Sequence, residues 1–571
     1  MIPHPVLTDR VDSLIATMSL AEKAGTLFHA MAYVLPPGPG GSVELGPVRH
    51  HLEAHRISHF AVMGPASPQQ MADLAHAIAD AGREAELPVP VTLSSDPRQV
   101  SADRPGHAAA ASGFSEWPEP LGIAALRDPD TAFLAGRATG EEFRAAGLHV
   151  LLGPQLDVLT ELRWARGTGT FGGDPELVIE TAGAYLRGLH GDNPKNRVSA
   201  VVKHFPGAGP QLDGEDSHFA YGKDQAYPGG HFETHLRPFE ALLGQGVTQV
   251  MPYYSRPIGI GLEEVGFAFN KEVITGLLRE RLGFDGVVLS DFGILTDHDI
   301  MGETVPARAW GLEDADVHTR VLRALEAGVD QFGGEAVPEV VVQLVEDSRI
   351  SEERIDQSVR RILLEKERLG LLDDAAPRPL AEERREQLRV AGLAAQRRAV
   401  TVLKGGWPAV PESAPAVSVS ATGEVDEELG DATAAVVLAE APSEPRSGFF
   451  ESMFPAGSLD FPDAQVAEIV DICRRMPTVV AVDLTRPAVL TPIVDEAAGL
   501  VVHYGCSRSV ILEVVRGGAP GEGRLPVQLP RSMADVLDGD LDAPLDIEDP
   551  LFEFGAGAAP RNHEIRKGTE R

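Results

Sequence analysis

Short apolar segments alternate with longer amphipathic segments along the first 370 residues of this chain. The apolar segments are typical of buried β-strands and the amphipathic ones of helices, and the pair recurs roughly seven or eight times. Strands joined through helices pair in parallel, and a sheet covered on both faces needs short apolar strands. The alternation therefore predicts a TIM-like (β/α)8 barrel for residues 1–370. The predicted strands are 57–63, 90–94, 149–156, 198–203, 249–253, 287–289 and 330–332, and the predicted helices include 9–27, 175–190 and 271–282.

A polar, proline-bearing stretch interrupts this pattern and marks the end of the barrel. We assign residues 371–395 to a linker and helix. The later apolar segments predict a smaller α/β sandwich domain over residues 396–558, and residues 559–571 form a polar tail that we expect to be mobile. The elements predicted in the second domain are strands at 434–438, 479–483 and 499–504 and a helix at 464–476.

Composition limits the partners of the chain. Hydrophobic residues make up 43% of it, enough for sizeable cores, and no apolar run reaches the length of a membrane span. The formal net charge of −35 argues against nucleic acid and anionic membranes as partners and disfavours polyanionic substrates. A neutral small molecule suits such a surface best. A homodimer is compatible with the sequence, which does not demonstrate one.

The cysteines and the N-terminus bear on the location of the protein. Cys473 and Cys506 are too few to form a disulfide framework in a chain of 571 residues. The first ten residues lack a basic segment followed by an apolar core, so no cleavable signal is expected. We therefore expect a cytoplasmic protein.

Charged, hydrogen-bonding and aromatic residues stand at or just beyond the carboxyl ends of the predicted barrel strands. Each one alone has an ordinary explanation, such as capping the next helix or pairing with a nearby charge. Barrel closure brings these strand ends to one rim, where barrel enzymes build their active sites. We therefore predict that they surround one cavity. They are Asp96, Asp157, Trp164, Arg166, Lys203, His204, Met251, Tyr254, Asp291 and Phe292.

The predicted cavity combines hydrogen-bond donors, hydrogen-bond acceptors and aromatic faces. Lysine, arginine and histidine side chains donate, two aspartates accept, and Trp164 and Phe292 supply the aromatic faces. This mixture suits a polyhydroxylated ring, whose hydroxyls both give and take hydrogen bonds while its C–H face stacks on an aromatic ring. The chain has no phosphate-binding glycine loop and no zinc-type His/Cys spacing, so we expect neither a cofactor nor a metal.

Three motifs at these strand ends resemble those of glycoside hydrolase family 3. They are Lys-His-Phe-Pro-Gly at 203–207, the Arg-Trp-Ala-Arg run with Phe-Gly-Gly-Asp-Pro within 163–175, and Gly-Val-Val-Leu-Ser-Asp-Phe at 286–292. The start of the chain and segments 523–526 and 550–555 are similar to the same family, so the resemblance covers nearly the whole chain. It is to the β-glucosidase-like, two-domain form, which implies an active site between a TIM-like barrel and an α/β sandwich.

The resemblance implies a retaining, exo-acting β-glycosidase, with glucose as the default sugar. Such an enzyme removes the non-reducing terminal sugar of short oligosaccharides or small glycosides through a covalent glycosyl-enzyme intermediate. Asp291 matches the position of the family's nucleophile. The residues implied to hold the hydroxyls of the sugar are Asp96, Arg166, Lys203, His204 and Tyr254.

The resemblance also implies an acid/base glutamate on a loop of the second domain. In the family this glutamate often follows Pro-Tyr, and here Glu444 comes two residues after Pro442, with Ser443 in place of the tyrosine. Glu444 is therefore the best match, and Glu451 and Glu440 on the same loop are the alternatives.

Two other functions stay open at this point. The β-N-acetylglucosaminidase branch of the family uses an Asp–His pair after the Lys-His motif, and this chain has Asp216 and His218 in that region. The spacing from Lys203 is longer than in that branch, and Ala208 replaces a histidine of its pattern. A non-catalytic sugar-binding relative is the second alternative, which the retained nucleophile disfavours.

Overall fold

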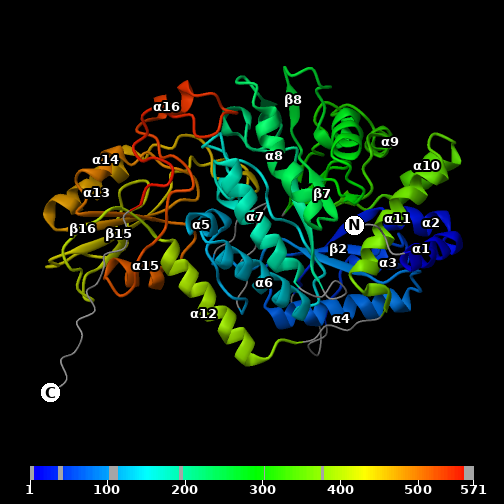
Figure 1. Cartoon of the computed structure of the whole chain (residues 1–571), viewed down its shortest axis with the longest axis horizontal. Helices are drawn as coiled ribbons and strands as arrows, with labels where there is room; N and C mark the ends of the chain where they lie inside the picture. Colours follow the sequence, from blue (N-terminus) through cyan, green and yellow to red (C-terminus); the bar gives the residue numbers. More distant parts are fainter. Residues whose placement is uncertain are drawn as a thin grey trace.

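The structure, a computed structural model, describes residues 5–35, 43–101, 113–191, 197–300, 302–373 and 379–557. Two β-sheets form the cores of two domains that lie next to each other (Figure 1). Helix α12 (Glu382–Ala399) runs along their junction, where it contacts α5 (Pro120–Ala125) of the first domain and α15 (Arg508–Val515) of the second.

Eight parallel strands form the barrel of the first domain. Their order is β12-β1-β2-β3-β4-β5-β7-β9, and every neighbouring pair is parallel. A parallel bridge between Leu289 and Gln331 joins the two edge strands, β9 and β12. The predicted fold class, a TIM-like barrel followed by an α/β domain, is confirmed. The strands are β1 (Phe28–Tyr33), β2 (His59–Met63), β3 (Thr92–Ser95), β4 (Val150–Leu151), β5 (Ser199–Phe205), β7 (Gln249–Pro252), β9 (Val287–Val288) and β12 (Phe332–Gly333).

Helices surround the barrel, and two of them differ from the prediction. The predicted helix 9–27 is split in two, because the Ser19 side chain accepts a hydrogen bond from Glu22 N and caps a new helix there. The predicted helix 271–282 is wound as a π-helix over Glu272–Arg281. The other helices of this domain are α1 (Pro5–Thr17), α2 (Leu20–Thr26), α3 (Val48–Glu53), α4 (Pro68–Glu84), α6 (Pro129–Ala145), α7 (Pro175–His190), α8 (Phe232–Leu242), α9 (Val317–Ala327), α10 (Pro338–Glu346) and α11 (Glu352–Arg368).

Strand β1 was not among the predicted strands. Its sequence, Phe-His-Ala-Met-Ala-Tyr, follows α2 closely and contains alanine and methionine, which favour helices. In the barrel it lies between β12 and β2, and Phe28, Ala30 and Ala32 are buried. Burial between two strands therefore outweighs the local helical preference.

The second domain is built on a five-stranded sheet in the order β13-β17-β16-β15-β14. Strand β13 is antiparallel to β17, and the other neighbouring pairs are parallel. Residues 374–378 of the predicted linker and the predicted polar tail, residues 559–571, lie outside the described residues. The elements are β13 (Thr401–Lys404), β14 (Ala416–Ser418), β15 (Ala435–Glu440), α13 (Asp463–Arg475), β16 (Thr478–Asp483), α14 (Thr491–Val494), β17 (Gly499–His503), α15 and α16 (Met533–Asp538).

Lys366 ties α11 to the amino ends of two barrel strands. This buried lysine donates hydrogen bonds to Ser58 O (3.2 Å), Pro90 O (2.8 Å) and Thr92 Oγ1 (2.7 Å), all at the amino ends of β2 and β3. Burial lowers the pKa of Lys366 well below its usual range. The opposite rim, at the carboxyl ends of the strands, is left to form a site.

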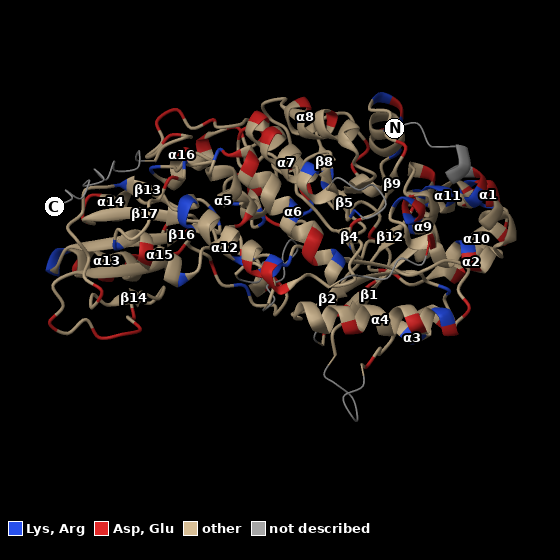
Figure 2. Cartoon of the chain, turned by 60° about the horizontal axis from the view of Figure 1, so that its bottom comes forward, with Lys and Arg blue, Asp and Glu red and all other residues tan. Residues whose placement is uncertain are grey.

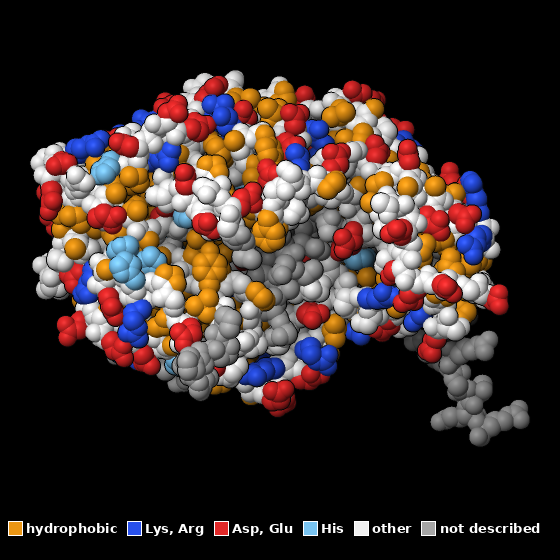
Figure 3. All heavy atoms as spheres, turned by 180° about the vertical axis from the view of Figure 1, so that it is seen from behind, with side chains coloured by type: hydrophobic (Ala, Val, Ile, Leu, Met, Phe, Trp, Pro, Cys, Tyr) orange, Lys and Arg blue, Asp and Glu red, His pale blue; other side chains and the backbone are white. Residues whose placement is uncertain are grey.

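Acidic side chains are spread over both domains, with lysines and arginines among them (Figure 2; Figure 3). They give the chain its net charge of −35, and the resulting field repels polyanions. None of the described helices combines the length and the apolar character needed to cross a lipid bilayer.

Glu142 of α6 links stability to pH. It accepts hydrogen bonds from Ser115 N (2.8 Å), Ser115 Oγ (2.9 Å) and Gln99 Nε2 (2.9 Å), and burial raises its pKa from 4.5 to about 7. The unfolded chain loses this proton at a lower pH than the folded chain, so the free energy of unfolding falls as pH rises through this window. In the wild type, the free energy of unfolding measured with urea should fall by on the order of 3 kcal/mol between about pH 5 and about pH 7.5. We expect Glu142→Gln to remove this fall.

Glu141→Gln on the same helix is the matched control. Burial would raise the pKa of Glu141, but its contacts with Arg384 and Arg137 lower the pKa overall, so Glu141 titrates below this window. The Glu141 variant should keep the wild-type slope between the two pH values. A wild-type slope in Glu142→Gln as well would contradict the assignment.

Candidate active site

Asp291 lies at the carboxyl rim of the barrel, three residues after β9. It is 7% exposed. Its Oδ1 accepts a hydrogen bond from Phe292 N (2.8 Å), whereas its buried Oδ2 accepts none from the described residues. One carboxylate oxygen is therefore held by the backbone, and the other is left for a reacting group.

Tyr254 and Arg166 are the charged and polar neighbours of Asp291. The Tyr254 hydroxyl donates to Phe292 O (2.8 Å), and burial together with the charge of Asp291 raises the pKa of Tyr254 well above its usual range. Burial would lower the pKa of Arg166, but Tyr253, Asp216 and Asp291 nearby raise it overall. The tyrosine therefore stays a neutral hydroxyl, and the arginine stays a cation between acidic groups.

Lys203 of β5 and Asp96, just beyond β3, form an ion pair at the same rim. The Lys203 Nζ to Asp96 Oδ1 distance is 3.2 Å, and the two side chains are 5% and 20% exposed. A cation beside a carboxylate offers a donor and an acceptor to neighbouring hydroxyls of a sugar.

His204 is held by Asp157, which lies a few residues beyond the end of β4. The Asp157 carboxylate accepts hydrogen bonds from His204 N (3.1 Å), Ala208 N (2.8 Å) and Gln155 Nε2 (3.1 Å), and its Oδ2 lies 2.8 Å from His204 Nδ1. Since the carboxylate is an acceptor, Nδ1 carries the proton. Burial lowers the pKa of His204 well below its usual range. Its Nε2 has no hydrogen-bond partner among the described residues and can accept a hydrogen bond from a hydroxyl.

The predicted aromatic and apolar residues divide into two groups. Trp164 has no exposed surface and packs edge-on against Tyr253 (6.1 Å between ring centroids) and His204 (6.5 Å), so it supports the hydrogen-bonding residues from behind. Met251 is buried in the barrel interior. Phe292 is half-buried and is the aromatic side chain with surface left for a sugar face.

Arg98 is a site residue that sequence reasoning missed. It is buried two residues after Asp96, and its guanidinium donates to Ser95 Oγ (2.7 Å), Val62 O (2.6 Å) and Gly64 O (2.5 Å). These bonds fix the backbone that presents Asp96. Two of its partners are backbone carbonyls, which leave no pattern in a sequence.

Arg308 is a second missed cation. Its NH1 donates to Phe292 O (3.2 Å), and its guanidinium carbon lies 5.5 Å from the Tyr254 ring centroid and 5.7 Å from that of Phe450 in the second domain. It therefore stands where the barrel rim meets the second domain, close to the residues around Asp291.

Asp216 and His218 form a buried pair beside the rim. His218 Nδ1 lies 2.6 Å from Asp216 Oδ1, and the His218 ring is 4.8 Å from that of Tyr254. Burial would raise the pKa of Asp216, but His218 and Arg166 lower it to about 2. The spacing from Lys203 disfavoured this pair, yet the fold brings it next to the predicted sugar site.

The second domain faces the rim with residues 442–458, which follow β15. Arg446 of this segment pairs with Glu215 (2.6 Å), and Phe450 N donates to Glu303 Oε2 (3.2 Å) on a barrel loop. The rings of Phe450 and Phe454 lie 6.0 Å and 4.9 Å from that of His218. Segment 442–458 therefore forms one wall of the site.

The three candidate acid/base glutamates have different surroundings. Glu440 ends β15 and lines a pocket of about 760 Å³ built from second-domain residues, including Asp483 and His503. Glu444 is exposed, and its Oε1 accepts a hydrogen bond from Ser458 N (2.9 Å). Glu451 follows Phe450 in the chain, and its Oε2 accepts a hydrogen bond from Gly448 N (3.4 Å). Glu440 is thus turned to its own domain, whereas the other two belong to the wall of the site.

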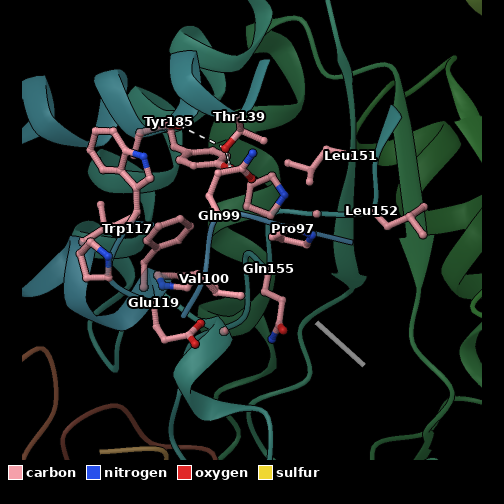
Figure 4. Close-up of a pocket in the computed structure, with 18 of the residues that line it drawn as sticks. Pro97, Gln99, Val100, Trp117, Glu119, Thr139, Leu151, Leu152, Gln155 and Tyr185 are labelled. Atoms are coloured by element: carbon pink, nitrogen blue, oxygen red, sulfur yellow. Dashed lines mark hydrogen bonds between the residues drawn. The ribbon is translucent and has the colours of Figure 1, made fainter. Parts of the chain in front are cut away.

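A small, mostly apolar pocket lies beside Lys203 and Gln155 (Figure 4). Its volume of about 50 Å³ suits one or two waters and is too small for a sugar ring. Trp117, Glu119 and Tyr185 also line it, and the Tyr185 hydroxyl is 2.9 Å from Thr139 Oγ1. It is therefore not the sugar site itself.

A parallel barrel that carries a carboxylate with one unbonded oxygen and several hydrogen-bonding side chains at its carboxyl rim is the arrangement expected of a glycoside hydrolase. Residues 52–364 match the Glycosyl hydrolase family 3 N terminal domain. The chain belongs to glycosyl hydrolase family 3.

Similar proteins cover nearly the whole chain. It is 41% identical over 583 residues to a protein of Aspergillus oryzae named "Probable beta-glucosidase C", covering 97% of this chain and 90% of that protein. It is 32% identical to the "Periplasmic beta-glucosidase/beta-xylosidase" of Dickeya chrysanthemi, covering 96% and 89%. The exo-1,3/1,4-beta-glucanase ExoP of a Pseudoalteromonas species shares the fold, with a TM-score of 0.76 at 19% identity, covering 98% and 75%.

A similarity to β-hexosaminidases is more limited in extent. The enzyme of that name from Stenotrophomonas maltophilia is 33% identical over 273 residues, which cover 45% of this chain.

Asp157→Asn should weaken catalysis through His204. If the amide oxygen keeps the bonds from His204 N and Ala208 N, the amide NH2 faces His204 Nδ1 and favours the tautomer that is protonated at Nε2. His204 Nε2 would then donate a hydrogen bond at the position where it should accept one from a hydroxyl of the sugar. Since a hydrogen bond to a charged group is worth about 1.5–3 kcal/mol, we expect kcat/KM on nitrophenyl β-glucoside to fall about 10- to 100-fold.

The stability of this variant is measured alongside by thermal unfolding. An unchanged kcat/KM in a folded variant would show that Asp157 does not set the state of His204.

Proposed function

We propose that this chain is a retaining, exo-acting β-glucosidase that releases terminal glucose from short oligosaccharides or small glycosides. The observation that carries the proposal is Asp291: one oxygen is fixed by the backbone, the other is unpartnered, and Arg166 and Tyr254 lie beside it. The relatives that match over almost the full length are named β-glucosidases. A neutral sugar also suits a chain with a net charge of −35.

The reaction proceeds in two displacements. Asp291 Oδ2 attacks the anomeric carbon while the acid/base group gives its proton to the departing glycosidic oxygen, so one C–O bond forms as another breaks. Water then attacks the same carbon, its proton passes to the acid/base group, and Asp291 leaves as a carboxylate. Two inversions at one carbon retain its configuration.

The residues around Asp291 hold the sugar in place for this attack. Asp96 and Lys203 are suited to one pair of neighbouring hydroxyls, and the free Nε2 of His204 accepts from another. Arg166 is buried beside Asp291 and keeps the region around the carboxylate cationic. Phe292 offers the ring on which the sugar stacks.

The acid/base group is proposed to be a glutamate of segment 442–458. Glu444 fits the family pattern, and Glu451 is the alternative because it is next in the chain to Phe450, whose ring contacts His218. Glu440 is disfavoured because it lines a pocket within its own domain. The buried Asp216–His218 pair supports the second candidate function, a β-N-acetylglucosaminidase.

The cellular location and the oligomeric state stay predictions. A cytoplasmic location is proposed from the sequence, and Cys473 and Cys506 are free thiols. One relative is named periplasmic, so the location follows neither from the fold nor from the family. A homodimer stays open in the same way.

Asp291→Ala should abolish turnover, because no other group can form the glycosyl ester. Wild-type protein incubated with a 2-deoxy-2-fluoro-glucoside should gain one sugar by mass spectrometry, and the modified peptide should contain Asp291. Proton NMR of the first product should show the β-anomer. Measurable labelling of the Asp291→Ala protein, or an α-anomer as first product, would contradict the nucleophile assignment.

The sugar is tested with matched nitrophenyl β-glucoside and nitrophenyl N-acetyl-β-glucosaminide. Turnover of the first substrate supports the proposed function, and turnover of the second alone would establish the alternative.

Leaving-group dependence identifies the acid/base group. Glu444→Gln, Glu451→Gln, Glu440→Gln and His218→Gln are compared on cellobiose and on 2,4-dinitrophenyl β-glucoside, which needs little protonation. Loss of the true acid should lower kcat/KM on cellobiose by about 100-fold or more and leave the activated substrate nearly unchanged. We expect this selective loss on cellobiose for Glu444→Gln or Glu451→Gln, and activity close to wild type for Glu440→Gln. A selective loss in His218→Gln alone would assign the acid/base role to the Asp216–His218 pair.

A further inference from the structure

Arg486 of the second domain is buried where segment 442–458 meets the barrel. It lies between β16 and α14 and has no exposed surface. Its guanidinium donates hydrogen bonds to five backbone carbonyls. They are Arg163 O (2.9 Å), Ala456 O (2.9 Å), Gly457 O (3.1 Å), Ser458 O (3.4 Å) and Pro442 O.

Four of these carbonyls belong to the two ends of segment 442–458. Pro442 lies where the chain leaves the second domain after β15, and residues 456–458 lie where it returns. One planar guanidinium therefore ties together both ends of the loop that carries Glu444 and Glu451.

The fifth carbonyl belongs to the barrel. Arg163 directly precedes Trp164, and its own backbone N–H and guanidinium are held by Glu161 (2.8, 2.9 and 2.7 Å). Trp164 in turn packs behind His204, and Arg166 follows two residues later. Arg486 thus joins the acid/base loop to the run of residues that lines the sugar site.

Arg486 is not explained by packing alone. Every hydrogen bond that its guanidinium makes to described residues goes to a backbone carbonyl, and burial lowers its pKa to about 10. Burying a cation is unfavourable unless its donors are satisfied, so an apolar side chain would fill this space at less expense in free energy. The five carbonyls gain a common partner that fixes their relative positions.

The other polar links between segment 442–458 and the barrel are weaker. The Arg446–Glu215 ion pair is about one-quarter exposed on both sides, where such pairs contribute little. The hydrogen bond from Phe450 N to Glu303 is 3.2 Å long and lies in the middle of the loop. The rings of Phe450 and Phe454 pack on His218, also in the middle of the loop. Arg486 makes the buried polar link at the two ends of the loop.

We propose that Arg486 is a positioning residue for the acid/base step, holding segment 442–458 in register with the sugar site through the carbonyls of Pro442, residues 456–458 and Arg163. The inference rests on the proposed function, because it takes the acid/base glutamate to lie in this segment. Arg486 acts through that glutamate and does not touch the substrate.

The test compares Arg486→Lys and Arg486→Met with the matched control Arg127→Lys. Arg127 also joins the two domains, through Leu525 O (3.1 Å) and the Phe554 ring, but it does not contact segment 442–458. For Arg486→Met we expect kcat/KM on cellobiose to fall about 100-fold, with less than about a 3-fold change on 2,4-dinitrophenyl β-glucoside. Arg486→Lys, whose ammonium can reach some of the carbonyls, should recover part of the loss, and Arg127→Lys should match the wild type on both substrates.

Two further readouts separate positioning from general damage. The kcat and the KM of Arg486→Met on the dinitrophenyl substrate should fall together, because hydrolysis of the glycosyl-enzyme lacks its base. Added azide should restore kcat, because azide attacks the glycosyl-enzyme without a base. Hydrogen exchange should increase in residues 442–458 and remain unchanged around Asp291.

Equal losses on the two substrates, or no loss on either, would overturn the proposal. Failure of the proposed function gives a different result, because wild-type protein would then lack β-glucosidase turnover and Asp291 labelling. If the Asp216–His218 pair is the true acid, wild-type turnover and labelling persist while Arg486→Met shows no leaving-group selectivity, which also overturns the proposal.

Discussion

Closure of the all-parallel barrel is the constraint on which the site depends. The bridge between Leu289 and Gln331 joins the edge strands, so the carboxyl ends of strands far apart in the sequence meet at one rim. Asp96, Lys203 and Asp291 follow or end three separate strands and come to lie at one rim only through this closure. No local element could bring these charges together, and the hydrogen-bonding chemistry of the site therefore follows from the topology of the sheet.

Charges gathered in this way are largely removed from water, and each must be balanced by its neighbours. Arg166 is buried between acidic groups, and Asp157 receives several N–H groups that also orient His204. The second domain adds the remaining wall through segment 442–458, which is joined to the barrel by polar bonds and by aromatic contacts with His218. The site is therefore an assembly of two domains, with Asp291, the proposed nucleophile, on the barrel and the candidate acid/base glutamates on a loop of the second domain.

The sequence predicted much of this arrangement where a local pattern exists. The helix predicted at 175–190 has the bounds of α7, and the rim residues were found because each follows an apolar strand. Strand β1 escaped prediction because its burial comes from partners at both sides, while its own residues favour a helix. Arg98, Arg308 and Arg486 escaped because they bond chiefly to backbone carbonyls, which any residue type can supply. The proximity of His218 to Tyr254 depends on a loop path that spacing alone did not indicate.

Lys366 ties α11 to the amino ends of β2 and β3, at the end of the barrel opposite Asp291. Segment 442–458 of the second domain contacts the carboxyl rim. On the proposed function, substrate arrives and product departs on the same side of the barrel, so a bound product sugar blocks the next glycoside. Glucose would then be a competitive inhibitor at the site where it is formed, with no separate inhibitory site.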